Sequence, residues 1–235
     1  MEGVSDKTAA RRGLLARVLS RVGNPLEWSL VDKGLLVCAA TLGFVIDYAL
    51  ISARIVGEPE AAPYADREVL TLLSVWMWAV AAGWAALLLV GIRIRKRRPD
   101  HRLYASACLQ YLALTDGALC YLLGPWTSPF AFALVLAAGV VGFLLFERAQ
   151  MLAALGTFVL ILFGTTVAEQ LGRIPHAPIL TAPPIVDGKV DLAWVLTIGG
   201  LSTLTATAAL AIADYLIRSW RGREEKLAEA YVLLR

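Results

Sequence analysis

Six long apolar stretches constrain the fold of this chain more than any other feature of its sequence. They are the runs 34–54, 69–92, 103–123, 129–146, 150–170 and 192–217. Each is close to the roughly 20 residues that an α-helix needs to cross the hydrocarbon core of a bilayer. The connections are short except for 171–191, and Pro, Gly and charged residues mark them. We therefore predict an all-α, polytopic membrane protein built as a six-transmembrane-helix bundle.

The composition excludes the main classes of soluble protein. Hydrophobic residues make up 58% of the chain and charged residues 17%, whereas soluble domains average roughly 45–50% and 25%. A soluble enzyme, a nucleic-acid-binding protein and a disordered regulator are therefore not expected. Residues 1–33 are polar and basic, and the first apolar run is too long for the core of a secretory signal peptide.

The distribution of lysine and arginine predicts the orientation. Of the 22 basic residues, 18 lie before the first run, after the sixth run, or in the connections between runs 2 and 3 and between runs 4 and 5. The opposite side holds only Arg54, Arg67, Arg173 and Lys189. Because cytoplasmic loops carry the excess of basic residues, we predict that both termini are cytoplasmic.

The two ends of the chain flank a membrane domain at 34–217 and show amphipathic helical patterns. In the basic segment 1–33, residues 11–22 have an apolar face suited to the inner leaflet, with a simple basic tail as the alternative. Segment 218–235 places Leu227, Ala230 and Leu234 at i, i+3 and i+7, typical of the first heptad of a parallel coiled coil. The pattern stops in mid-heptad, so we expect an output domain to follow; the alternative is a frayed tail.

No catalytic, metal-binding or cofactor-binding constellation is recognisable in the sequence. His101 and His176 lie outside the apolar runs, so neither is placed to ligate a haem within the bundle. Cys38, Cys108 and Cys120 lie within the runs, where we interpret them as small packing residues. Metalloprotease, serine hydrolase and phosphate-loop motifs are absent from the sequence. We therefore expect residues 1–235 to be no enzyme and to bind no cofactor.

Two carboxylates within the runs are the strongest candidates for a functional site. Asp47 and Asp116 each lie 13 residues beyond the start of their run, which places both about 20 Å from the cytoplasmic side. Arg54 is the nearest basic residue in the sequence and belongs to the outer surface. A carboxylate at such depth is costly unless it faces water, a partner or the bundle interior. The two acids either line a wet cavity, share a proton, or form ordinary packing hydrogen bonds.

Aromatic and polar residues at a similar depth extend this candidate ligand-binding site. They are Tyr48, Trp76, Trp78, Gln110 and Tyr111. Aromatic rings near two carboxylates suit a small, mostly apolar ligand with one polar group. For Trp76 and Trp78, ordinary core packing is the alternative. Run 6 is rich in Thr, Ser and Gly, small residues that allow helices to approach and to slide.

The order of these features resembles a known group of receptors. Its elements are Asn24-Pro25-Leu26, six spans with an Arg-rich second connection, Leu145-Phe146-Glu147-Arg148, Gly172-Arg173-Ile174-Pro175 and Trp220-Arg221-Gly222-Arg223-Glu224-Glu225-Lys226-Leu227. The chain resembles the six-helix membrane receptor domains of bacterial class III adenylate cyclases along nearly its whole length. It is also similar to the sensor domains of quorum-sensing histidine kinases and of some diguanylate cyclases.

The resemblance implies a sensor in a bacterial inner membrane. Such a sensor would form a homodimer through the sixth predicted span, 192–217, and the coiled coil. It would bind a small apolar ligand or respond to the bilayer. Its output would be a cytoplasmic adenylate cyclase, with a histidine kinase or diguanylate cyclase as the alternatives. The residues themselves leave two other classes open: a small transporter or channel that uses Asp47 and Asp116, and a purely structural membrane anchor.

Overall fold

The computed structural model describes residues 25–57, 64–124, 139–183, 185–186, 188–192 and, with gaps, 195–222. The chain divides into two units, residues 29–214 and the two ends, 1–28 with 215–235. In the second unit the short 3-10 turn η1 spans Pro25–Glu27. The predicted signal-transmitting residues Leu227, Ala230 and Leu234, and the amphipathic segment 11–22, lie outside the described residues.

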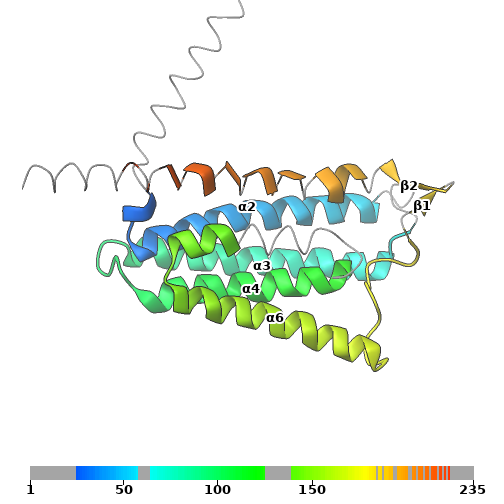
Figure 1. The fold of residues 1–235 in the computed structure, drawn as a ribbon. Coiled ribbons are helices and arrows are strands. Elements are labelled where there is room, and N and C mark those ends of the chain that lie inside the picture. Colours follow the sequence, from blue (N-terminus) through cyan, green and yellow to red (C-terminus); the bar gives the residue numbers. More distant parts are fainter. Residues whose placement is uncertain are drawn as a thin grey trace, which may run out of the picture. The chain divides into compact units, whose positions relative to one another are not determined.

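Four long helices form the body of the unit 29–214 (Figure 1). They are α2 (Leu30–Gly57), α3 (Arg67–Ile94), α4 (Arg102–Leu123) and α6 (Arg148–Gln170). Each is long and apolar enough to cross a membrane, so four of the six predicted runs form helices of membrane-spanning length. The predicted span 129–146 is described from residue 139, and 139–145 are helical. In the predicted span 192–217, the π-helical turn η3 (Val195–Gly199) precedes residues that are helical wherever the structure describes them.

Polar caps extend these helices beyond the apolar runs. At the start of α2, the Ser29 hydroxyl accepts a hydrogen bond from the amide of Asp32 at 3.2 Å. At the start of α3, the Asp66 carboxylate accepts from the amides of Glu68 and Val69 at 2.9 and 3.0 Å. Such side chains satisfy amides that have no partner within the helix. The capping residues, and not the limits of the apolar runs, determine where these helices begin. For this reason α2 begins at Leu30 and not at residue 34.

Two tyrosines of α4 hold it against α3. The hydroxyl of Tyr104 donates to the carbonyl of Leu87 at 3.2 Å, and that of Tyr111 donates to the carbonyl of Val80 at 3.1 Å. The glycines that lie against the two rings are Gly91 and Gly83. Because glycine has no side chain, each ring can approach the backbone of α3 closely enough for its hydroxyl to reach a carbonyl. These tyrosine contacts fix the register between α3 and α4.

α2 packs against α3 and α4, and cysteines mark its contact with α4. The Sγ atoms of Cys38 and Cys108 lie 3.5 Å apart, and Cys38 Sγ lies 3.6 Å from the Tyr104 hydroxyl. All three cysteines are buried and form no disulfide, in agreement with the packing role predicted for them. Both helices begin at the same end of the unit, so α2 and α4 are parallel.

The connections at that end of the unit are basic. The amide of Val31 donates to the carbonyl of Pro99 at 2.9 Å. This contact brings the start of α2 to the Arg-rich turn between α3 and α4. Arg102 forms an exposed ion pair with Glu147 at 2.9 Å, beside the start of α6. The basic connections predicted to share one side of the membrane therefore meet at one end, here named the basic end.

The segment after α6 folds over the opposite, distal end. It includes a hairpin of β1 (Ile185–Val186) and β2 (Lys189–Val190), with Gly188 at a positive φ of 73° in the turn. The amide of Asp66 donates to the carbonyl of Ile179 at 2.8 Å, and the amide of Ile179 donates to that of Leu122 at 3.3 Å. These bonds dock the segment on the ends of α3 and α4.

Candidate functional site

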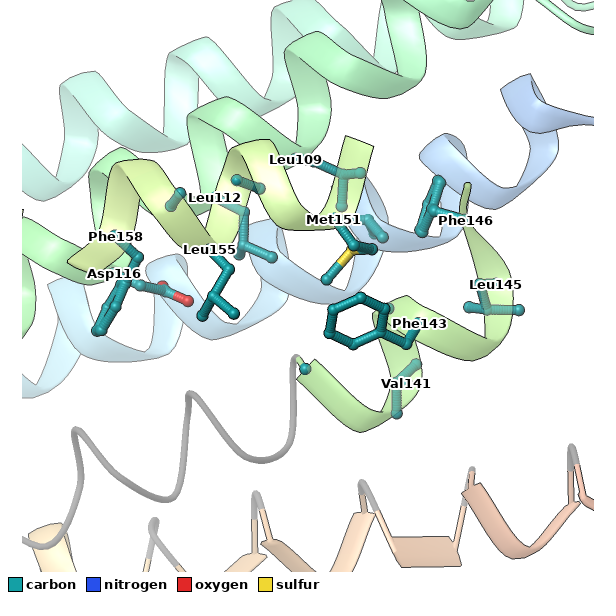
Figure 2. A pocket seen from close by; sticks show the side chains of 15 residues that line it. Leu109, Leu112, Asp116, Val141, Phe143, Leu145, Phe146, Met151, Leu155 and Phe158 are labelled. Atoms are coloured by element: carbon teal, nitrogen blue, oxygen red, sulfur yellow. The ribbon is translucent and has the colours of Figure 1, made fainter. Parts of the chain in front are cut away.

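An apolar pocket of about 130 Å³ lies between α4, α6 and the helical segment 139–145 (Figure 2). Leu109 and Leu112 of α4 form one wall, and Leu155 and Phe158 of α6 form another. Phe143 contributes from the segment 139–145. The pocket therefore combines side chains from three stretches of the sequence, with a further contribution from α2.

Glycine and the polar contacts of α6 set the shape of this pocket. Gly142 lies against the side chain of Met151 with no space for a Cβ atom, so the segment 139–145 comes close to α6. On the other side, the hydroxyl of Thr157 donates to Oε1 of Gln110 at 2.7 Å. The side-chain amide of Gln150 donates to the hydroxyl of Ser106 at 3.0 Å. Interhelical hydrogen bonds of this kind bind helices together in a bilayer.

Asp116 carries the only polar side chain among the described residues that line the pocket. In Figure 2 its carboxylate lies toward the same end of the pocket as the ring of Phe158. Within the described part of the chain, the carboxylate accepts no hydrogen bond and forms no ion pair. A carboxylate in apolar surroundings is costly unless something compensates its charge. Among the described residues, the pocket thus contains one acid that has no hydrogen-bond or ion-pair partner.

Tyr48 is the second predicted site residue that belongs to this region. It is buried on α2 and interacts electrostatically with both Asp116 and Asp47. The contact between Cys38 and Cys108 sets the register of the parallel helices α2 and α4. Nine residues further along each helix, Asp47 of α2 is level with residue 117 of α4. This register explains why Tyr48 interacts with both acids. Asp47 itself is exposed on α2 and does not line the pocket. Tyr48 therefore interacts with both predicted acids, but only Asp116 faces the cavity.

The other predicted ligand-binding residues lie elsewhere. Gln110 is engaged with Thr157 in the α4–α6 contact. Tyr111 faces α3 and packs on the fully buried Trp84, with ring centroids 4.9 Å apart. Trp76 lines a separate apolar groove between α3 and α4, and Trp78 is 48% exposed. Of the predicted set only Asp116 lines the pocket, whereas Tyr48 interacts with it electrostatically and these four residues do not line the pocket.

Sequence reasoning missed the apolar residues that enclose the cavity. Phe143, Phe146 and Phe158 line it but stand in runs where nearly every residue is apolar. Neither spacing nor residue type distinguishes them from phenylalanines that face lipid. The one usable signal is the short link at 145–148, which forces the segment before it to fold back against α6.

The distal segment is anchored by a buried tyrosine outside the helices. The hydroxyl of Tyr64 donates to the carboxylate of Asp191 at 2.8 Å. Burial, and then this hydrogen bond to a carboxylate, raise the pKa of Tyr64 well above its ordinary value. The amide of Thr181 donates to the carbonyl of Tyr64 at 2.8 Å. Tyr64 thus ties the hairpin region to the start of α3.

No cluster of three or more His, Cys, Asp or Glu side chains that could hold a metal ion occurs among the described residues. No family model matches the sequence, and no curated protein or solved structure is significantly similar to the chain.

Proposed function

We propose that this chain is the membrane receptor module of a bacterial signalling protein, and that the pocket beside Asp116 binds its small, mostly apolar ligand. The observation that supports this proposal is an apolar cavity with a single acid among its described lining residues. Ligand sites combine apolar walls with a few polar groups that orient the ligand. An engineered apolar cavity of about 150 Å³ holds benzene, so a pocket of about 130 Å³ suits one aromatic ring or a short branched chain.

The module would sit in the inner membrane with both termini in the cytoplasm. This orientation is supported by the basic end, where the connections between α3 and α4 and between residue 145 and α6 come together. Positive residues favour the cytoplasmic side. The distal segment would then face outward.

Ligand binding would be transmitted through α6 and the run 192–217. A ligand in the pocket contacts α6 and the segment 139–145 directly, and any shift of α6 acts on the distal segment and the run that follows it. In a homodimer, paired coils at Leu227, Ala230 and Leu234 would carry this shift to a cytoplasmic enzyme. The resemblance favours an adenylate cyclase, with a histidine kinase or diguanylate cyclase as alternatives. Driving such a two-state output from mostly off to mostly on takes about 5.5 kcal/mol of differential binding.

A chimaera tests this proposal. Residues 1–235 are fused to the catalytic domain of an adenylate cyclase, and cyclic AMP production in membranes is measured against increasing benzyl alcohol, a ring with one polar group. Ala154 lines the pocket, whereas Ala153 is exposed on the same helix. Ala154→Phe should fill the cavity and remove the response, and Ala153→Phe should retain it.

Two outcomes would contradict the receptor proposal. One is a cyclase activity that does not respond to the probe in the unmodified chimaera, although ligand-observed NMR detects probe binding to the pocket. The other is ligand flux through proteoliposomes that hold residues 1–235 alone, lost in Ala154→Phe. That result would favour the transporter alternative.

A further inference from the structure

We infer that the pocket selects a lipophilic cation: an ammonium group paired with Asp116 and an apolar group about the size of one aromatic ring. This inference rests on the proposed ligand-binding role of the pocket and specifies the charge of the ligand. Three observations on the described residues support it: a carboxylate with no partner among them, no lysine or arginine beside it, and the aromatic lining.

The carboxylate of Asp116 is the first observation. It faces an apolar cavity, and the described part of the chain offers it neither a hydrogen bond nor an ion pair. A neutral hydroxyl on a ligand would donate one hydrogen bond but leave the charge in place. A cation on the ligand would donate hydrogen bonds and also compensate the charge.

The described residues place no lysine or arginine side chain beside Asp116. Arg54 is the only lysine or arginine within the six apolar runs, and it lies near the end of α2. The sequence of the neighbouring stretch 125–138, which the structure does not describe, also contains none. A second copy of the chain has the same sequence and the same deficit. Apart from a proton on the carboxylate itself, a positive charge at the level of Asp116 therefore has to come from another molecule.

The lining of the pocket suits the rest of such a molecule. Phe143, Phe146 and Phe158 all line it. Phe158 lies toward the same end as Asp116 in Figure 2. Aromatic faces attract ammonium groups and also pack against an apolar ring. The volume of about 130 Å³ limits the enclosed apolar part to roughly one ring.

Two probes of nearly equal shape test the inference. Benzylamine is a cation at neutral pH, and benzyl alcohol is its neutral counterpart. Binding of each to the full chain in phosphatidylcholine nanodiscs is measured by ligand-observed NMR, with Ala154→Phe as the blocked control. We expect benzylamine to bind about tenfold to a hundredfold more tightly, the range carried by a hydrogen bond to a charged group.

Substitutions of the two acids assign the preference to one carboxylate. Asp116→Asn should bring the affinities for the two probes close to each other while retaining the binding of benzyl alcohol. Asp47→Asn is the matched control, because Asp47 lies at a similar depth but does not line the pocket. It should leave the preference for benzylamine unchanged.

Each remaining outcome has a distinct meaning. If benzyl alcohol binds as tightly as benzylamine to the unmodified chain, the inference about charge is wrong and the pocket remains a ligand site. If the preference for benzylamine survives in Asp116→Asn, the inference about charge is also wrong and the pocket remains a ligand site. If neither probe binds, the inference and the proposed ligand-binding function both fail.

Discussion

The contact between Gly34 and Tyr104 allows a sharp test of how closely α2 and α4 pack. A Cβ atom at Gly34 would lie 2.7 Å from Cε1 and 3.3 Å from Cδ1 of Tyr104. Carbon atoms in ordinary contact lie about 3.5–4.0 Å apart. The ring would have to move by about 1 Å, yet its hydroxyl is bonded to the carbonyl of Leu87 at 3.2 Å. Gly34→Ala should therefore strain the contact between α2 and α4 and the hydrogen bond to α3.

The size of the effect follows from two opposing terms. Overpacking a close contact typically costs about 1–3 kcal/mol, whereas alanine in place of glycine stabilises a helix by about 1 kcal/mol. Gly43 in the same helix has nothing within 4 Å of its Cβ position, so Gly43→Ala changes only the second term. Comparing the two variants cancels helix propensity. We expect Gly34→Ala to have a free energy of unfolding lower than that of Gly43→Ala by about 1–3 kcal/mol.

Reversible unfolding in mixed micelles of a mild detergent and dodecyl sulfate measures this difference. A second pair of variants carries Tyr104→Ala in addition, which removes the ring that the new methyl group meets. In that background Gly34→Ala and Gly43→Ala should have equal effects. The reasoning would be refuted if the two alanine variants were equally stable with Tyr104 in place.

Three further predictions concern single contacts. Tyr111→Phe removes the hydrogen bond to the backbone of α3 and should lower the free energy of unfolding by about 0.5–1.5 kcal/mol in the same titration. Tyr64→Phe removes the hydrogen bond to Asp191 and should speed amide hydrogen exchange in the distal segment but not in α2; unchanged exchange would show that other contacts hold that segment. Arg102→Ala breaks the exposed ion pair with Glu147 and should change the free energy of unfolding by less than about 1 kcal/mol, and a larger loss would contradict its classification as a surface pair.

The helical body was predictable because membrane-spanning helices have a strong sequence signal. Four runs of apolar residues coincide with α2, α3, α4 and α6, since the bilayer imposes both length and composition. The helix ends were less predictable, because single capping groups such as Asp66 determine them. The two-residue strands of the distal hairpin were not predicted, because so short a pairing has no periodicity to detect.

The candidate site was predictable only in its charged member. Asp116 stands out because a carboxylate is rare within an apolar run, and the structure places it in the pocket. Which helix faces meet depends on features too subtle to read from the sequence, such as the space beside Gly83 that admits the ring of Tyr111. That contact turns Tyr111 toward α3 and away from the pocket. Position along a helix was therefore predictable, whereas direction around the helix axis was not.

The tyrosine contacts have a consequence for how the pocket could respond to an occupant. On one side, two hydrogen bonds between tyrosine hydroxyls of α4 and carbonyls of α3 hold the two helices together. This wall of the pocket should therefore stay fixed. On the other side, residues 139–145 carry no side chain that can donate or accept a strong hydrogen bond. Their sliding against α6 would break no side-chain hydrogen bond of their own. Expansion of the cavity should therefore displace the stretch 139–145 first, and spin labels placed there would report occupancy sooner than labels on α3.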